Sequence, residues 1–189
     1  MIGVLALQGA FIEHEKVLER LGVPCRELRQ ARDLEKPYDG LILPGGESTV
    51  QGKLLKELGM FDPIKKKIRA GMPVLATCAG MILLAESIEG QPDGQPSSWF
   101  GTMSMTVKRN AYGRQLGSFH TEAPVAGLGT VPMTFIRAPY VASVSDDARV
   151  LATVEDNIVA VRHGNQLAFS FHPELDPDLR IHKTFLDLI

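Results

Sequence analysis

Three residues of this chain have the types and spacing that nucleophilic catalysis requires, and the first is a cysteine. Cys78 follows the short apolar run at residues 74–76 and precedes a second apolar run without glycine at residues 81–88. A buried strand followed by a helix predicts a tight bend at the cysteine. The unpaired N–H groups and the dipole of the helix start would favour the thiolate. Cys78 is therefore a candidate nucleophile, although a small buried core cysteine would give the same pattern.

A histidine and a carboxylate lie two residues apart near the end of the chain. His172 and Glu174 follow the apolar stretch at residues 167–171, which predicts a strand. Residues i and i+2 of an extended segment point to the same side, so Glu174 could orient or neutralise the His172 imidazole. Either residue alone is weak evidence, because a lone histidine is more often structural. Together with Cys78 they supply a nucleophile, a general base and acid, and an orienting group.

The first half of the chain alternates between patterns typical of strands and of helices. This alternation favours an α/β fold in three layers, with a mainly parallel central sheet and helices on both faces. Ligands bind at the carboxyl ends of the strands in such sheets, so the loop at residues 44–49 and Cys78 would share one edge. Strands are predicted at residues 2–7, 25–28, 40–43 and 74–76, and helices at residues 12–21, 50–58, 63–70 and 81–88.

The second half changes character and predicts extra antiparallel strands. Proline, glycine, glutamine and serine dominate residues 90–98, which indicates a surface loop rather than a domain boundary. A length of 189 residues suits one domain with a sizeable core, so we expect a single domain over residues 1–189. The predicted strands are residues 102–108, 130–137, 150–154, 158–162 and 167–171, with a hairpin turn at residues 162–166 and a closing helix at residues 183–189.

Composition and charge narrow the class of function. A net charge of −2 does not indicate a nucleic-acid or anionic-membrane partner. Cys25 and Cys78 give no disulfide framework, and no C-x-x-C or H-E-x-x-H spacing offers a metal site. The chain starts directly in an apolar strand, and no apolar run approaches the roughly 20 residues of a membrane span. We therefore expect no membrane segment and a reducing, cytoplasmic location.

Three motifs resemble those of the class I, triad-type glutamine amidotransferases. They are Ala-Thr-Cys-Ala-Gly at residues 76–80, Phe-His-Pro-Glu at residues 171–174 and Pro-Gly-Gly-Glu-Ser-Thr at residues 44–49. The resemblance covers essentially the whole chain and implies a flavodoxin-like fold. The chain departs from the family at Ala76, where glycine is usual; alanine is still small but could tighten the bend at the cysteine. Further segments narrow the resemblance to the glutaminase subunits of pyridoxal 5'-phosphate synthase: residues 3–11 with Glu13 and His14, residues 109–115 and residues 135–139.

This resemblance implies a role for each residue of the catalytic set. Cys78 would attack the side-chain amide carbon of L-glutamine, and His172 would protonate the departing ammonia. His172 would then activate the water that hydrolyses the thioester, while Glu174 holds the imidazole in its productive orientation. The tetrahedral oxyanion needs preorganised N–H donors. The resemblance places them on the backbone of Ala79 and of the glycine pair Gly45 and Gly46.

The same resemblance implies a substrate pocket and a contact edge. A guanidinium suits the glutamine carboxylate because it forms two parallel charge-assisted hydrogen bonds, although an arginine considered alone is more often a surface residue. Residues 8–10 end the first predicted strand on the same edge and could contact a partner. His14, His120, His163 and His182 are interpreted as structural or surface residues, with a claim to an interface role for His14 from the resemblance. Cys25 is interpreted as inert. The residues implied to bind substrate are Gly46, Glu47, Ser48, Arg109, Ile136 and Arg137.

A glutaminase without a second domain makes ammonia that its own chain cannot use. In the resembling family the ammonia passes to a separate (β/α)8 synthase subunit, which forms a dodecameric core decorated with glutaminase subunits. We hypothesise that the Gly45–Gly46 peptide completes the oxyanion hole only when that partner docks, because adjacent glycines flip a peptide cheaply. No cofactor is expected, since nothing in the sequence resembles a Schiff-base lysine site for the pyridoxal product.

Three alternatives remain open at the level of the sequence. The chain could be the glutaminase subunit of another synthase, such as those of histidine, anthranilate or aminodeoxychorismate formation; residues 7–9 and 109–115 argue against these. It could be a free-standing hydrolase of γ-glutamyl amides, which would be active without a partner. It could also be a regulatory module that keeps the fold but not the chemistry, against which the complete set of Cys78, His172 and Glu174 argues.

Overall fold

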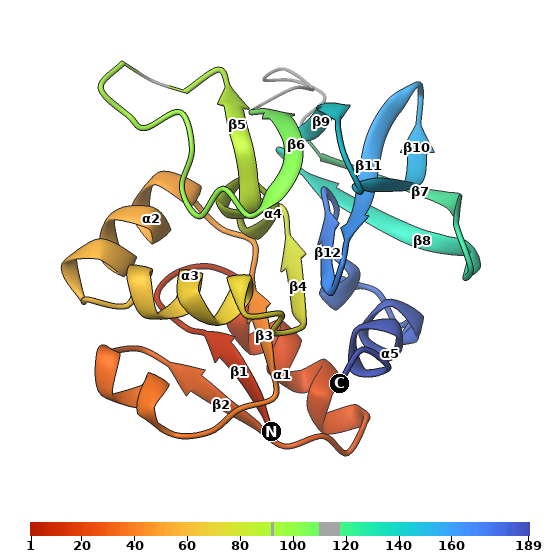
Figure 1. Ribbon diagram of the computed structural model, residues 1–189. Helices are drawn as coiled ribbons and strands as arrows, with labels where there is room; N and C mark the ends of the chain where they lie inside the picture. Colours follow the sequence, from red (N-terminus) through yellow and green to blue (C-terminus); the bar gives the residue numbers. More distant parts are fainter. Residues whose placement is uncertain (92, 110–117) are drawn as a thin grey trace.

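The computed structural model describes residues 1–91, 93–109 and 118–189 of the chain (Figure 1). The first half contains β1 (Ile2–Leu5), α1 (Phe11–Arg20), β2 (Cys25–Leu28), the 3-10 helix η1 (Ala31–Glu35), β3 (Gly40–Leu43), α2 (Ser48–Glu57), α3 (Phe61–Arg69), β4 (Val74–Thr77), α4 (Ala79–Leu84) and β5 (Ala85–Glu89). The second half contains β6 (Met103–Lys108), β7 (Ser118–Val125), β8 (Gly129–Ile136), β9 (Tyr140–Val144), β10 (Arg149–Val154), β11 (Asn157–His163), β12 (Gln166–Phe169), the 3-10 helix η2 (Pro173–Leu175) and α5 (Arg180–Leu186).

One central sheet connects the two halves of the chain. Its strand order is β2-β1-β3-β4-β12-β11-β9-β6-β5, with β10 paired to β11. Strands β2, β1, β3, β4 and β12 run parallel, and the direction changes at the antiparallel hairpin of β12 and β11. The prediction of a mainly parallel α/β sheet with extra antiparallel strands is confirmed. Because β4 and β12 are parallel neighbours, the segments that follow them emerge at the same edge of the sheet.

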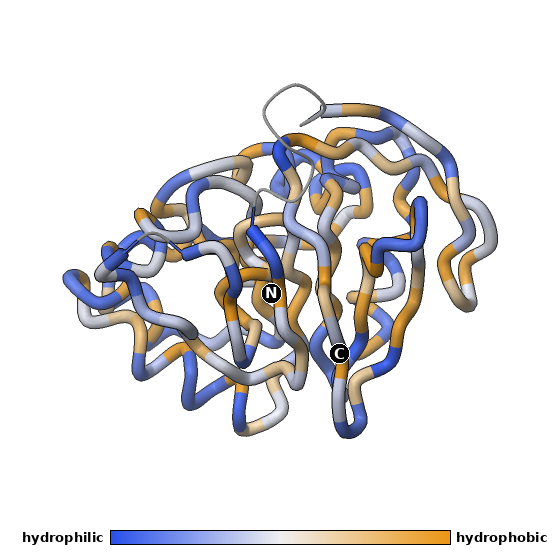
Figure 2. The backbone as a smooth tube through the Cα atoms, turned by 90° about the horizontal axis from the view of Figure 1, so that it is seen from above, coloured by the Kyte–Doolittle hydropathy of each residue, from blue (hydrophilic) through white to orange (hydrophobic). Residues whose placement is uncertain are grey.

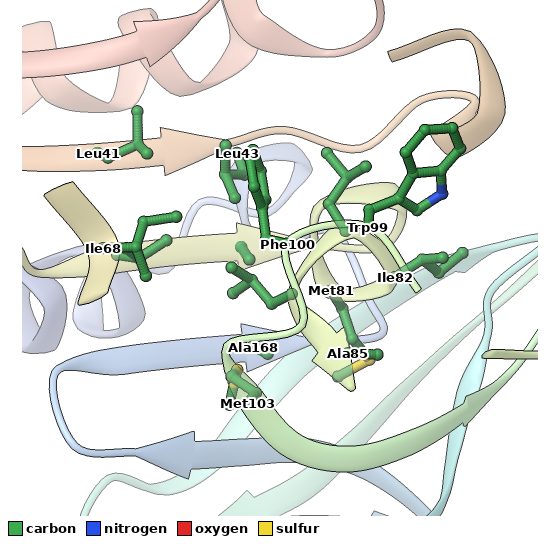
Figure 3. Packing of buried hydrophobic residues seen from close by; sticks show 14 of the residues in the cluster. Leu41, Leu43, Ile68, Met81, Ile82, Ala85, Trp99, Phe100, Met103 and Ala168 are labelled. Carbon is green, nitrogen blue, oxygen red and sulfur yellow. The ribbon is translucent and has the colours of Figure 1, made fainter. Parts of the chain in front are cut away.

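Helices cover both faces of the sheet, as predicted (Figure 1). Helices α2 and α3 bury Leu55, Ile64 and Ile68 in one hydrophobic cluster, whose close packing around Phe100 and Met81 is visible in Figure 3. On the other face, α1 and α5 contribute to a second cluster through Leu18, Ile181 and Phe185. Seen from above, apolar segments concentrate along the central strands and polar ones on the outer loops and helices (Figure 2). None of the helices in the described residues has the length and hydrophobicity needed to cross a membrane.

A separate two-stranded sheet, formed by β7 and β8, covers part of the second face. Its buried side chains, among them Phe135, join the cluster that holds Phe169 and Phe171, and the Phe135 and Phe171 rings lie 5.6 Å apart. The carbonyl of Thr134 in β8 accepts a hydrogen bond from the His172 N–H at 2.8 Å. This sheet therefore fixes the backbone of the segment that carries the candidate catalytic histidine.

The structure corrects several predicted elements. The helix predicted at residues 81–88 ends at Leu84, and the chain continues as β5, because Ala85 and Ile88 turn inward and pair with β6. Strands β7 and β9 were not predicted; the inward and outward residues of β7 alternate, but His120 and Glu122 on its outer face mask the apolar pattern. The first strand ends at Leu5 rather than at residue 7. Strands β2 and β3 and the hairpin turn between β11 and β12 lie where they were predicted.

Helix α4 lies in close contact with β3, and a substitution at Gly80 tests how rigid this contact is. A Cβ atom at Gly80 would lie 2.1 Å from the Leu43 carbonyl oxygen, and a backbone atom cannot move aside cheaply. We expect Gly80→Ala to lower the free energy of unfolding by about 1–3 kcal/mol, as overpacking typically does. Urea denaturation measures the change. A value within about 0.5 kcal/mol of wild type, the usual range for neutral substitutions, would contradict a rigid contact between these elements.

Candidate active site

Cys78 occupies a strained bend between β4 and α4. Its backbone has φ 47° and ψ −102°, in a region that side-chain-bearing residues rarely adopt and that costs about 1–3 kcal/mol. Its N–H donates to the Phe169 carbonyl at 2.8 Å, so the neighbouring strand β12 holds the bend in place. The strand-to-helix bend predicted from the two apolar runs is present. The Cys78 side chain lines a pocket at the carboxyl edge of the sheet.

Alanine at position 76, where the resembling family usually has glycine, does not disturb the bend at Cys78. Ala76 lies inside β4, fully buried in the cluster beneath α2 and α3. Its register partners on the neighbouring strands are Leu43 and Ala168, and both are fully buried as well. The methyl group therefore contributes to the core rather than to the geometry of Cys78.

His172 and Glu174 form a buried pair behind the cysteine. The Nδ1 atom of His172 lies 2.7 Å from Oε1 of Glu174, and both residues are 6% exposed. The segment is not the extended strand that the sequence predicts: it turns at once into η2, and the Leu175 N–H donates to the His172 carbonyl at 3.2 Å. The predicted pairing is present, but the tight turn brings the two side chains together, not the alternation of a strand.

The charges at the pair stabilise one another. Burial alone would lower the pKa of His172, but its contacts with Cys78 and Glu174 outweigh burial and raise the pKa to about 10. Burial likewise tends to raise the pKa of Glu174, but His14 and the hydrogen bond with His172 hold that pKa below its ordinary value. At neutral pH the pair is therefore an imidazolium and a carboxylate. Such an imidazolium is poised to donate a proton to a leaving group beside Cys78.

The pocket in front of Cys78 has a volume of about 350 Å³ and is lined by all six residues predicted to bind substrate. Ala79 does not line it, but this residue begins α4, where the first N–H groups have no acceptor within the helix. Within residues 1–91, 93–109 and 118–189, no group of three or more His, Cys, Asp or Glu side chains could hold a metal ion. The residues that line the pocket include Gly45, Gly46, Glu47, Ser48, Arg109, Ile136 and Arg137, together with Cys78, His172 and residues 8–10.

Arg109 is a partly buried residue of this pocket rather than a surface one. Its guanidinium donates to a carboxylate oxygen of Glu47 at 2.7 Å and to the hydroxyl of Thr49 at 3.1 Å, and its side chain is 11% exposed. Glu47 in turn caps α2 by accepting a hydrogen bond from the Val50 N–H at 2.7 Å. The pair thus presents a cation and an anion side by side at the pocket wall. The rest of the predicted segment, residues 110–115, lies outside the described residues.

The loop after β3 packs directly against the histidine. A Cβ atom at Gly45 would lie 2.3 Å from Cε1 of His172, so only glycine fits at this position. The Gly45 N–H donates to the Thr77 hydroxyl at 3.0 Å, and its carbonyl accepts from the Ala10 N–H, also at 3.0 Å. The first bond holds the peptide between Pro44 and Gly45, and the second holds the carbonyl of the Gly45–Gly46 peptide. The N–H of Gly46 points opposite to the bonded carbonyl, because the peptide is trans.

Known proteins resemble this chain over nearly its whole length. The model of the SNO glutamine amidotransferase family matches residues 4–189. The chain belongs to this family. It is 61% identical over 188 residues to "Pyridoxal 5'-phosphate synthase subunit PdxT" of Desulfitobacterium hafniense, covering 100% of this chain and 92% of the relative. It is 55% identical over 190 residues to the protein of the same name from Haemophilus influenzae, covering 99% and 97%.

Solved structures agree with this membership. A crystal structure described as a glutamine amidotransferase superposes with a TM-score of 0.91 at 45% identity, over 99% of this chain and 97% of the other. A glutamine amidotransferase from Thermotoga maritima superposes with a TM-score of 0.65 at 17% identity, over 98% of this chain and 80% of the other, and shares the fold. These superpositions confirm the flavodoxin-like architecture expected from the motifs.

Two glutamines, of which the sequence indicated only Gln8, hold the glycine loop of this amidotransferase in place through hydrogen bonds. The side-chain oxygen of Gln8 accepts from the Glu47 N–H at 2.7 Å. The side-chain amide of Gln51 donates to the Gln8 carbonyl at 2.9 Å and to the Pro44 carbonyl at 3.2 Å. The sequence predicts a partner contact for residues 8–10, and the structure gives the Gln8 side chain this role inside the chain. The sequence feature that could have revealed these hydrogen bonds is Gln51, a polar residue on the buried side of a helix.

Two histidines interpreted as structural or surface residues lie behind the pair of His172 and Glu174. His14 and His182 are fully buried, so an interface role for the His14 side chain is wrong in this structure. His14 shares the buried face of α1 with Val17 and Leu18, at the i+3 and i+4 spacing that could have revealed it. In contrast, the side chain of His120 is 54% exposed.

The raised pKa of His172 predicts a pH-dependent contribution to stability. The pair with Glu174 stabilises the folded state fully below pH 6.5, the ordinary pKa of histidine, and this contribution is lost as the pH rises through about 10. We expect the free energy of unfolding of wild type to exceed that of Glu174→Gln by more near pH 6.5 than near pH 10. Urea denaturation of both proteins at the two pH values gives the comparison. A difference that stays constant or grows with pH would contradict the pairing.

Proposed function

We propose that this chain is the glutamine-hydrolysing subunit of a pyridoxal 5'-phosphate synthase, which converts L-glutamine and water to L-glutamate and ammonia. The observation that carries the proposal is that His172, hydrogen-bonded to Glu174 at 2.7 Å, lines the same pocket as Cys78. A cysteine, a base and an orienting carboxylate are the groups that this amide hydrolysis requires. The relatives described as PdxT subunits support the assignment to this synthase.

In the first half of the reaction, the Cys78 thiolate attacks the side-chain amide carbon of glutamine. A carbon–sulfur bond forms, and the carbonyl electrons move onto oxygen to give a tetrahedral oxyanion. His172, as the imidazolium, donates its proton to the amide nitrogen, the carbon–nitrogen bond breaks and ammonia leaves. A glutamyl thioester remains on Cys78. The raised pKa of His172 supports this order, because the proton is on the imidazole before the substrate reacts.

In the second half, the neutral His172 takes a proton from water, and the hydroxide adds to the thioester carbon. The second tetrahedral intermediate collapses, the carbon–sulfur bond breaks, and glutamate leaves as a carboxylic acid that then ionises. Cys78 returns to the thiolate and His172 to the imidazolium. Glu174 holds Nδ1 of His172 throughout, so that Nε2 carries out both proton transfers.

Backbone N–H groups stabilise both oxyanions in this proposal. One donor is the N–H of Ala79 at the start of α4, and the other is the N–H of Gly46 in the glycine pair with Gly45. Loss of one such donor typically costs about 3 kcal/mol of transition-state stabilisation. The close packing of Gly45 on His172 supports this assignment, since it brings the glycine loop next to the site of attack.

The pocket wall is suited to an amino acid. The guanidinium of Arg109 suits the glutamine carboxylate, and the carboxylate of Glu47 suits the ammonium group. The ion pair between these two residues supports the proposal, because a zwitterion can insert between groups of matching charge. Gly46, Ser48, Ile136 and Arg137 complete the binding site.

The ammonia is passed to a (β/α)8 synthase subunit in a large complex with a dodecameric core. We propose that docking of this partner turns the Gly45–Gly46 peptide and so completes the oxyanion hole. The bond from the Ala10 N–H to the Gly45 carbonyl would then have to break. Residues 1–189 act as one amidotransferase domain, as the continuous sheet suggests, and the two unpaired cysteines suit the reducing cytoplasm.

Ammonia release tests the activity and the partner together. We expect strong stimulation of glutamate and ammonia production when the synthase subunit of the same organism is added to the chain. Cys78→Ala should reduce the stimulated rate to background while the complex still forms, because only the nucleophile is removed. Coupled glutamate assays and gel filtration measure the two properties.

The other outcomes distinguish the alternatives. Full activity of the chain alone, unchanged by the synthase subunit, would indicate a free-standing hydrolase. Stimulation only by the synthase of another pathway would indicate a different ammonia acceptor. A complex that forms without any glutamine hydrolysis would indicate a regulatory module and would overturn the proposed chemistry.

A substitution at Ala10 tests the proposed rotation of the Gly45–Gly46 peptide. Ala10→Pro removes the N–H that holds the Gly45 carbonyl, and proline suits the φ of −84° at this position. If that bond keeps the hole unformed, we expect the glutaminase rate of the chain without partner to rise about tenfold, as expected when a hydrogen bond of about 1.4 kcal/mol is lost from the resting state. Ala10→Gly retains the N–H and is the matched control. An unchanged or lower rate in Ala10→Pro would argue against the switch.

A further inference from the structure

A buried pair of histidines lies behind Glu174, on the side away from His172, and takes no part in the proposed reaction. His14 comes from α1 and His182 from α5, the two helices that cover the same face of the sheet (Figure 1). Neither side chain is exposed. Two buried imidazoles with nothing to bind would be costly, because buried polar groups are stable only when they are hydrogen-bonded. Their contacts therefore indicate what they hold in place.

His14 faces three polar groups from three different elements. Its Nε2 atom lies 3.5 Å from Oε2 of Glu174 and 3.2 Å from the hydroxyl of Thr77. Its Nδ1 atom lies 2.9 Å from Nε2 of His182. Among the described residues, Oε2 of Glu174 has no hydrogen-bond partner closer than this 3.5 Å contact with His14, while Oε1 is bonded to His172. The two oxygens of the carboxylate are thus divided between His172 in front and His14 behind.

The protonation of His14 follows from its surroundings. Burial lowers its pKa, as does His172, although Glu174 and Glu13 raise it, so that the ring is neutral and carries one proton. Burial and His14 also lower the pKa of His182 to about 3, although Glu174 raises it, and His182 is neutral as well. Each of the two rings can therefore donate one hydrogen bond.

The neighbouring carboxylate of Glu174 favours one arrangement of the two protons. With its proton on Nε2, His14 donates toward Glu174 and Thr77 and accepts at Nδ1 from His182. The opposite arrangement would aim a lone pair at the carboxylate. It would also place the His182 proton on Nδ1, which has no partner among the described residues. A buried donor without an acceptor costs about 1–3 kcal/mol.

We infer that His14 is a positioning residue of the amidotransferase, which holds Glu174 toward His172 by donating from Nε2 to the free carboxylate oxygen. The inference rests on the proposed function, since it assigns a role in the same site. Through Thr77, which also accepts the Gly45 N–H at 3.0 Å, His14 links the catalytic carboxylate to the glycine loop of the oxyanion hole. One buried imidazole thus connects the proton-transfer groups to the oxyanion donors.

The chain offers a matched pair of variants for this role. Glutamine places its side-chain N–H near the position of Nε2 of histidine, while asparagine places it near Nδ1. His14→Gln therefore keeps the donor toward Glu174, and His14→Asn keeps only a group facing His182. Both variants are polar and of similar size, so a loss of folding alone would affect them alike, and thermal unfolding of each checks this.

The experiment measures kcat, KM and their pH dependence for the full chain with the synthase subunit. We expect kcat of His14→Asn to fall by roughly tenfold to a hundredfold, the range for loss of a hydrogen bond to a charged group, with KM unchanged because His14 does not line the pocket. His14→Gln should retain most of kcat. The second half of the reaction needs neutral His172, so kcat rises with pH as His172 loses its proton. In His14→Asn this rise should move to higher pH, because a less stabilised Glu174 carboxylate holds the His172 proton more tightly.

The outcomes separate this inference from the proposed function. If wild type releases no ammonia and iodoacetamide does not alkylate Cys78, the proposed function fails. If wild type is active but His14→Asn and His14→Gln have equal kcat and equal pH profiles, the positioning role is overturned and the cluster serves folding alone. The rate at which iodoacetamide alkylates Cys78 in the free chain should also differ between the two variants without any partner, because it depends on the imidazolium that His172 forms beside Cys78.

Discussion

The buried charge of Glu174 is the constraint on which the site depends. Its side chain has no exposed surface, and an ion that leaves water loses several kcal/mol of solvation. The protein compensates from opposite sides, with the imidazolium of His172 on one oxygen and the N–H of His14 proposed for the other. The stability of the carboxylate and the basicity of His172 are therefore two results of the same interaction.

This constraint determines which elements have to meet. Glu174 comes from η2 and His14 from α1, while Thr77 ends β4 and Gly45 follows β3. In a parallel sheet all of these segments emerge at the carboxyl edge, so the order of the strands alone brings residues distant in sequence together. The antiparallel half contributes by a different route, because β8 holds the backbone of His172 through Thr134. Strand β8, which lies outside the central sheet, thus supports the site.

The sequence predicted most of the parallel half and the grouping of the site residues, because turn or loop residues bound the strands at residues 25–28 and 40–43 and the two apolar runs around Cys78 demand a bend. Strand β5 and the turn of η2 were missed, since α4 ends without a glycine or proline and a single 3-10 turn leaves no periodic pattern. The buried polar network was the least predictable part, because His14 and His182 are 168 positions apart. Helical spacing with the apolar residues of α1 would have placed His14 in the core, but not beside a carboxylate.

The last residues of β4 position both the nucleophile and the groups that support Glu174. Successive residues of a strand point to opposite faces, and here Ala76 enters the core beneath α2 and α3 while Thr77 points to the face of α1 and α5. The next residue, Cys78, leaves the strand at a strained bend and enters the pocket. Because Thr77 bonds both the Gly45 N–H and His14, a displacement of this strand end would move the nucleophile, the oxyanion loop and the support of Glu174 together. A contact that shifts one of them therefore acts on all three, which is the property that control by a docking partner requires.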